Sequence, residues 1–206
     1  MELQEKGIPV PETILIPQNT DKPFETILDE IPWEDFVVKP CIGAGSVGLE
    51  RFNKDSPDLK QHFMNLNRYG FHIDYPRLGR LDLLPCDTLV QPYLPEIIQN
   101  GEASLIYYGG EFSHSVIKYV KSGDFRAHPG WGAEVLLYNA SPEEIEVGHN
   151  VLDAVGYPTE YARLDMMPNE EGPVVIEVEL IDPMMFFDHQ PETAEAYAIH
   201  IEKFFK

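Results

Sequence analysis

Three glycines in the stretch FVVKPCIGAGSVG, residues 36–48, have the spacing G-x-G-x-x-G: Gly43, Gly45 and Gly48. Glycine lets a backbone approach an anion closely, because it has no Cβ and its N–H group can point at the ligand. A strand, FVVK, precedes the run, but no helix opens at the third glycine and no G-K-[S/T] closes a Walker A loop. The pattern predicts either a hairpin that folds over phosphates with Lys39 beside it, or an ordinary flexible turn.

Acidic residues alternate with apolar ones in the last two predicted strands. In VVIEVELI, Glu177 and Glu179 share one face, and in YARLDMM the same alternation puts Arg163 and Asp165 on one face. A loop centred near Glu171 would place Asp165 opposite Glu177. Crowded carboxylates need a positive charge among them, and Mg²⁺ bridged to ATP phosphates is the natural candidate. The alternative is the solvated face of an amphipathic hairpin.

A second polar cluster contains His114, Lys118 and, in the segment GDFRAHPGWGAE, Arg126 and His128. A guanidinium in a loop bounded by glycine and proline can bind a carboxylate or phosphate through two hydrogen bonds, although a solvated surface arginine is the commoner case. Serines flank His114, but there is no G-x-S-x-G elbow, and adjacent residues on a strand point to opposite faces. The cluster therefore favours anion binding over a hydrolase triad.

The first half of the chain is expected to contain few regular elements besides the glycine hairpin. A strand is predicted at 10–16, followed by an irregular, proline-punctuated segment to Trp33. A helix is predicted at 56–69, with Ser56 as its N-cap and a glycine as its stop. Residues 71–87 show no clear periodicity and are expected to form a long loop.

The second half is expected to be more regular. DTLVQPYLPEI predicts a strand, and EASLIYYGGEFSHSVIK predicts two strands joined by a tight turn at Gly109 and Gly110. Ser141 and Glu144 form a capping box at the start of an amphipathic helix, and a final helix is predicted at 192–205. Antiparallel hairpins with interspersed helices place the chain in the α+β class.

Composition limits the possible partners. The chain has 206 residues, of which 43% are hydrophobic, so it can bury one substantial core or two small ones. Its formal net charge of −20 would repel nucleic acid and anionic membrane surfaces, and neither is an expected partner. No window is long and apolar enough to span a bilayer, and the start lacks a signal peptide, so the expected location is cytoplasmic.

Six segments occur in the order found in ATP-grasp enzymes: FVVKP with its glycine loop, LVQPYLPEI, GEASLIYYGGEFSHSVIK, GDFRAHPGWGAE, YARLDMM and VIEVELIDP. From Gly7 onward the chain resembles this superfamily, in particular the bacterial group of the cycloserine-pathway ligase and, more distantly, glutathione synthetase. The resemblance implies an ATP-grasp fold, in which two α+β subdomains with mostly antiparallel sheets sandwich the nucleotide. They would be 1–90, with the lid hairpin, and 91–206.

The resemblance implies two groups of ATP-binding residues. Lys39 would contact the α and β phosphates, beneath a mobile lid made by the glycine loop. The lid positions are Gly43, Gly45, Ser46 and Gly48. A hinge would bind adenine through its backbone, and Glu96 would reach the ribose. The hinge residues are Gln91, Pro92, Tyr93 and Leu94.

The resemblance also implies a reaction. Asp165, Glu177 and Glu179 would hold Mg²⁺, while Lys118 and Arg126 would stabilise the transferred phosphoryl group and an acyl phosphate. ATP would phosphorylate a small-molecule carboxylate, and an amine would then attack the mixed anhydride to form an amide. The protein would contribute mainly positioning and charge neutralisation. The alternative is an ATP-binding interaction module that keeps the fold and lacks turnover.

The sequence departs from the family pattern in three places. Relatives carry an additional α/β domain with a second nucleotide-contacting lysine before the position numbered 1 here, so a homodimer or a partner protein is expected to complete the acceptor cleft. Many relatives have asparagine where Glu179 stands, a change that keeps a metal ligand and adds charge. An amide is common where His128 stands, so the acyl-phosphate contact at that position differs.

Overall fold

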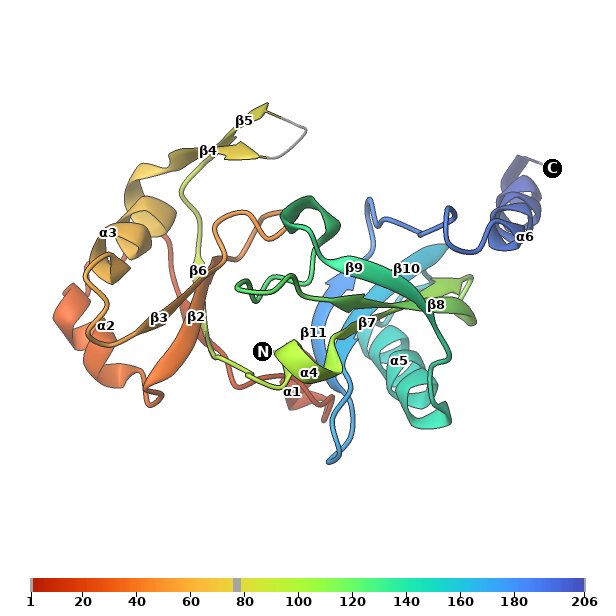
Figure 1. The fold of residues 1–206 in the computed structure, drawn as a ribbon, viewed down its shortest axis with the longest axis horizontal. Helices are drawn as coiled ribbons and strands as arrows, with labels where there is room; N and C mark the ends of the chain where they lie inside the picture. Colours follow the sequence, from red (N-terminus) through yellow and green to blue (C-terminus); the bar gives the residue numbers. More distant parts are fainter. Residues whose placement is uncertain (1, 76–78, 206) are drawn as a thin grey trace. The chain divides into compact units, whose positions relative to one another are not determined.

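The computed structural model in Figure 1 describes residues 2–75 and 79–205. The chain divides into two compact units. One unit is Pro11–Leu94, and the other combines Met1–Val10 with Pro95–Lys206. Each contains an antiparallel sheet and helices, as an α+β protein should. Within the described residues, no helix is both long enough and apolar enough to cross a membrane.

This division differs from the expected subdomains 1–90 and 91–206. The chain passes from one unit to the other after Leu94, and the residues up to Val10 belong to the later unit. Ile8 explains the second difference, because it is buried in the core of the later unit, with Leu3 and Val10 packed beside it. The sequence around an apolar residue near the start of a chain does not indicate which of two hydrophobic cores the residue will join.

The Pro11–Leu94 unit contains a four-stranded antiparallel sheet. Its strands, in spatial order, are β1 (Ile14–Ile16), β6 (Thr88–Pro92), β2 (Asp35–Pro40) and β3 (Glu50–Asn53). Phe36 and Val38 alternate inward along β2 and are almost fully buried. β2 and β3 form the predicted hairpin, which holds the glycine run in its loop.

The helices of this unit correct two predictions. The segment predicted to be irregular contains α2 (Phe24–Glu30), which is short and buries Ile27. The helix predicted at 56–69 begins later, as α3 (Leu59–Met64), and continues as the π-helix η1 (Asn65–Tyr69). Ser56 is not its N-cap, because the Ser56 hydroxyl instead accepts a hydrogen bond from the backbone N–H of Asn53, at 3.0 Å.

The segment 71–87 also differs from its prediction. It contains a two-stranded hairpin, β4 (Phe71–Tyr75) and β5 (Gly79–Leu83), rather than a long loop. Leu81 and Leu83 of β5 do alternate with the exposed Arg80 and Asp82, but they are only half-buried and the strand has no buried residue, so its pattern is a weak signal.

The other unit contains a five-stranded antiparallel sheet. In spatial order the strands are β11 (Val174–Glu179), β10 (Tyr161–Met167), β7 (Glu102–Tyr108), β8 (Glu111–Tyr119) and β9 (Glu134–Tyr138). Both predicted hairpins are present, β7 with β8 around Gly109 and Gly110, and β10 with β11. The α+β prediction is thus met, and the strand pairs of these two sheets are all antiparallel.

Helix α5 (Pro142–Val155) covers one face of this sheet. Its predicted capping box is present, with the Ser141 hydroxyl accepting from the Glu144 N–H and the Glu144 carboxylate accepting from the Ser141 N–H. Val151 and Leu152 pack on inward residues of the sheet such as Leu105 and Leu164. Because strand side chains alternate, Ser104 of β7 and Asp165 of β10 face the opposite side. The candidate site lies on that opposite face.

The remaining short elements of this unit are α1 (Glu2–Glu5), α4 (Ile97–Asn100), η2 (Pro129–Trp131), α6 (Glu192–Glu202) and η3 (Lys203–Phe205). The predicted final helix is therefore present as α6 with a terminal 3₁₀ turn. Its Tyr197 ring packs on Tyr108 of β7, with ring centroids 5.0 Å apart.

Candidate functional site

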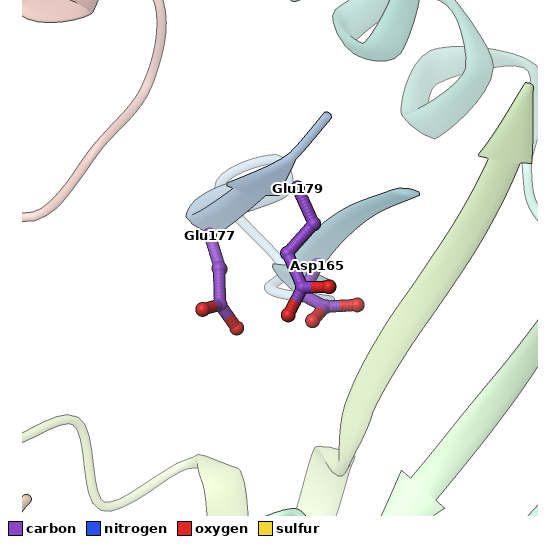
Figure 2. A group of neighbouring side chains, drawn as sticks. All are labelled: Asp165, Glu177 and Glu179. Carbon is purple, nitrogen blue, oxygen red and sulfur yellow. The ribbon is translucent and has the colours of Figure 1, made fainter. Parts of the chain in front are cut away.

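The acidic cluster forms as the strand pattern predicts. Asp165 on β10 is paired with Glu177 on β11, and Arg163 is paired with Glu179. Figure 2 shows the three carboxylates on the same side of the hairpin. One oxygen from each of Asp165, Glu177 and Glu179 lies within 4.8 Å of the others. A β-bulge directly after Asp165 ends this regular register.

Arg163 and Lys118 supply positive charge within the cluster. Arg163 Nη2 lies 2.8 Å from Asp165 Oδ2 and 2.6 Å from Glu179 Oε1, and Arg163 Nε lies 3.0 Å from Asp165 Oδ1. The Lys118 ammonium lies 3.3 Å from Asp165 Oδ2. The requirement for a cation among crowded carboxylates, argued above for Mg²⁺, is thus partly met by the chain itself.

Two further residues of β7 complete a buried network. Glu102, at the start of the strand, contacts the Lys118 ammonium through Oε1. The Ser104 hydroxyl donates to Asp165 Oδ1 at 2.5 Å. The Asp165 side chain is fully buried and that of Lys118 is 4% exposed. Charges of opposite sign therefore alternate from Glu102 through Lys118, Asp165 and Arg163 to the acids of β11.

Opposite charges outweigh burial at Asp165 and Lys118. Although burial acts to raise it, the pKa of Asp165 is lowered to about 2 by Lys118 and Arg163. Burial also acts against the charged form of Lys118, yet Asp165 and Glu102 raise its pKa. Burial raises the pKa of Glu102, while the neighbouring ammonium opposes that rise. Asp165 and Lys118 are therefore ionised near neutral pH.

Glu177 differs from its neighbours. Its side chain is 50% exposed and lies 3.8 Å from Arg163 Nη2. Partial burial and the charges of Asp165 and Glu179 raise the pKa of Glu177 to about 7. A carboxylate that is disfavoured by its neighbours gains most from an added cation. Three carboxylates on one face form an all-oxygen donor set, which is the set that Mg²⁺ prefers, so the residues fit a magnesium ion.

Arg126 lies in the loop after β8 and has neighbours that hold its guanidinium. Nε and Nη2 bind the two carboxylate oxygens of Asp124, each at 2.9 Å, and the guanidinium carbon lies 3.7 Å from the ring centre of Trp131. His128 follows in the same loop, where burial and the charges of Lys118 and Arg163 lower its pKa. This loop therefore lies within electrostatic range of the network.

The glycine loop contains three residues with left-handed backbone conformations. The φ angles of Gly45, Ser46 and Gly48 are 61°, 58° and 80°. A Cβ at Gly48 would lie 3.1 Å from Leu66 Cδ2. Glycine is therefore favoured at position 48 for two reasons: its φ is positive, and a side chain would crowd Leu66. Lys39, half-buried on β2, lies opposite Leu89 of β6.

The predicted hinge occupies the end of the Pro11–Leu94 unit. The Gln91 side-chain amide donates to the Thr13 hydroxyl at 2.8 Å. Arg51 stacks on the Tyr93 ring, with its guanidinium carbon 3.7 Å from the ring centre. Pro92 ends β6 and Leu94 is the last residue of the unit, while the exposed Glu96 precedes α4 in the other unit.

The predicted site residues therefore belong to two units. Lys39, the glycine loop and the hinge lie in Pro11–Leu94. Lys118, Arg126 and the three acids lie in the other unit, where the structure brings Lys118 and the acids together.

Two residues of the network, Glu102 and Ser104, were not among the predicted site residues, and Arg163 was only placed on the face of Asp165. A signal for Arg163 existed, because its spacing of two from Asp165 puts both on one strand face. Glu102 had no such signal, because a β-bulge between Ile106 and Tyr107 decides its partner.

The chain is similar in sequence to two kinds of characterised protein. The chain is 24% identical over 214 residues to the cycloserine biosynthesis protein DcsG of Streptomyces lavendulae, a match that covers 96% of this chain and 65% of that protein. It is 27% identical over 113 residues to a glutathione synthetase of Prochlorococcus marinus, covering 55% of this chain and 32% of the synthetase. The chain thus spans less than two thirds of these relatives' lengths. No protein-family model matches.

Solved structures establish the fold. The crystal structure of D-cycloserine synthetase DcsG matches with a TM-score of 0.77 at 22% identity, over 100% of this chain and 68% of that one. A D-alanine–D-alanine ligase of Bacillus anthracis matches with a TM-score of 0.66 at 20% identity, over 97% of this chain and 60% of the ligase. The same ligase in complex with ATP matches with a TM-score of 0.65 at 19% identity, over 98% of this chain and 60% of that one.

Proposed function

Because the chain has the ATP-grasp fold, we propose that it is an ATP- and Mg²⁺-dependent ligase that joins a small-molecule carboxylate to an amine. The observation that carries the proposal is the convergence of Asp165, Glu177 and Glu179 beside a buried Lys118. A merely solvated acidic face would not keep Asp165 fully buried among two cations and a hydroxyl.

Asp165, Glu177 and Glu179 would hold the magnesium ion. When bound, the ion would neutralise phosphate charge and align the phosphates for in-line transfer. Glu177 is the acid best suited to take up a cation, because it is half-exposed and its ionised form is the least stabilised by the chain. Glu179 would exchange part of its pairing with Arg163 for the ion.

The remaining candidates would bind and orient the reactants. Lys39 and the N–H groups of the glycine loop suit the phosphates, and the backbone of 91–94 suits adenine. Lys118 and Arg126 would stabilise charge on the transferred phosphoryl group and on an acyl phosphate, because both are cations held in place by neighbouring carboxylates. The amine would then displace phosphate from the acyl phosphate and form the amide.

The test is to measure ADP release from ATP in the presence of Mg²⁺ and a panel of L-amino acids, D-amino acids and small amines. Glu177→Gln should abolish most of the release, whereas Glu171→Gln, an exposed acid in the same hairpin, should leave it unchanged. Binding of ATP without ADP release on any substrate would favour the alternative, an ATP-binding module without turnover. Failure to bind ATP would overturn both proposals.

A further inference from the structure

Glu102 is a mostly buried acid to which the proposed reaction gives no role. Its side chain is 14% exposed, and it stands opposite Lys118 in the β7–β8 ladder. Burying a carboxylate is unfavourable unless a partner compensates, and here the partner is the Lys118 ammonium. The position of Glu102 therefore bears on how Lys118 is held.

Lys118 is shared between two acids. Its ammonium contacts Glu102 Oε1 and lies 3.3 Å from Asp165 Oδ2. The lysine side chain is only 4% exposed, so water cannot easily replace either partner. Two carboxylates thus compete for one buried ammonium, and weakening one contact strengthens the other.

Asp165 has no spare oxygen for a divalent cation in this arrangement. Oδ1 accepts from Ser104 at 2.5 Å and from Arg163 Nε at 3.0 Å. Oδ2 accepts from Arg163 Nη2 at 2.8 Å and lies 3.3 Å from the Lys118 ammonium. A cation must therefore displace one donor from Asp165. Lys118 makes the longest of these contacts. The second carboxylate of Arg163, Glu179, is itself a proposed ligand of the cation, whereas Lys118 can withdraw to Glu102, which is not.

We infer that Glu102 is a positioning residue that holds the Lys118 ammonium away from Asp165, so that Asp165 can bind a divalent cation. This inference rests on the proposed cation site. Without the Glu102 carboxylate, Lys118 is drawn fully onto Asp165 and competes with the cation. Glu102 touches neither the ion nor a substrate in this scheme, and it acts through Lys118.

The test is a double-mutant cycle on the full chain, with Mn²⁺ as the probe and free Mn²⁺ measured by electron paramagnetic resonance. Glu102→Gln should weaken Mn²⁺ binding by about tenfold, which is within the range of coupling between contacting charged residues. In a Lys118→Met background the same substitution should change the Mn²⁺ affinity by less than about twofold, because no ammonium is left to compete.

Other outcomes separate the possible failures. An equal weakening in both backgrounds would mean that Glu102 acts only as a nearby negative charge, and it would overturn the inference. Unchanged Mn²⁺ binding in Glu102→Gln would also overturn it. If the unmodified chain binds no Mn²⁺, the proposed cation site is wrong and the inference is wrong with it. This result differs from the two above, in which the unmodified chain does bind Mn²⁺.

A second variant guards against loss of folding. Glu102→Asp keeps the charge but withdraws the carboxylate by one methylene, so it should weaken Mn²⁺ binding by less than Glu102→Gln does. A merely structural role would instead give Mn²⁺ affinities unrelated to the presence of Lys118. Circular dichroism and thermal unfolding establish which variants are folded, and if Glu102→Gln is not, the cycle is completed with Glu102→Asp.

Discussion

Asp165 lies directly opposite Glu177 across the β10–β11 ladder, yet the two acids have different surroundings. Asp165 is fully buried and contacts Arg163, Lys118 and Ser104, while half of the Glu177 side chain is exposed. The pKa of Asp165 is lowered to about 2 and that of Glu177 is raised to about 7. One acid therefore holds the network together and the other is the more available for a ligand.

This difference predicts unequal effects of the two substitutions on the free energy of unfolding. Asp165→Asn should lower the free energy of unfolding by about 3–5 kcal/mol, because it leaves two buried cations without their shared partner. Glu177→Gln should change it by less than about 0.5 kcal/mol, because the residue is half-exposed and loses repulsion from its neighbours. Urea denaturation measures both. Equal losses for the two variants would contradict this assignment.

Magnesium should stabilise the chain against heat. An ion that binds only the folded state adds a free energy of RT ln(1 + [L]/Kd), which is about 2.7 kcal/mol at a hundredfold excess over Kd. The melting temperature should therefore rise with MgCl₂, and EDTA should reverse the rise. Glu171→Gln should respond as the unmodified chain does and Glu177→Gln should not. A rise that persists in Glu177→Gln would place the ion elsewhere.

His62 should make stability depend on pH. Its Nε2 donates to the Gly48 carbonyl at 3.0 Å, and the ring packs between Phe52 and Phe71. Burial lowers the pKa of His62 below its ordinary value of 6.5, against the opposing effect of this hydrogen bond. The unfolded chain then binds the proton more tightly, so this contribution is complete above pH 6.5 and is lost as the pH falls through the lowered folded pKa.

Urea denaturation from about pH 5 to about pH 8 measures this effect. His114 and His128 also have lowered pKa values, so the relevant quantity is the difference between the unmodified chain and His62→Gln. The unmodified chain should lose more stability on acidification than the variant. Identical losses would show that His62 does not contribute.

Gly48→Ala should distort the glycine loop. Alanine at φ +80° is strained by about 1–2 kcal/mol, and its Cβ would also crowd Leu66 Cδ2 at 3.1 Å and Pro40 Cδ at 3.2 Å. Gly123→Ala is the matched control, because its φ of +85° is similar but nothing lies within 4 Å. ATP binding, measured by calorimetry, should weaken in Gly48→Ala alone. Equal ATP affinities in the two variants would remove the loop from the proposed ATP site.

Sequence pattern alone was sufficient for the features that depend on local spacing. Alternation of side chains and the length of one loop fixed the pairing of Asp165 with Glu177. The glycine hairpin and the capping box at Ser141 likewise depend on residues close together in the chain. Such features are predictable because their geometry is set by the period of a strand or by the first turn of a helix.

The tertiary structure decided the partners of the charges. A tight turn at Gly109 and Gly110 pairs Tyr107 with Phe112, and continuing that register would set Glu102 opposite Ile117 and would put Lys118 on the other face of the sheet. The bulge after Ile106 shifts the register by one residue and brings Glu102 to Lys118 instead. An irregularity of one residue has no reliable sequence pattern, yet it reverses which face a side chain occupies. For the same reason, only the folded sheet shows that Lys118 joins Arg163 in neutralising much of the acidic cluster.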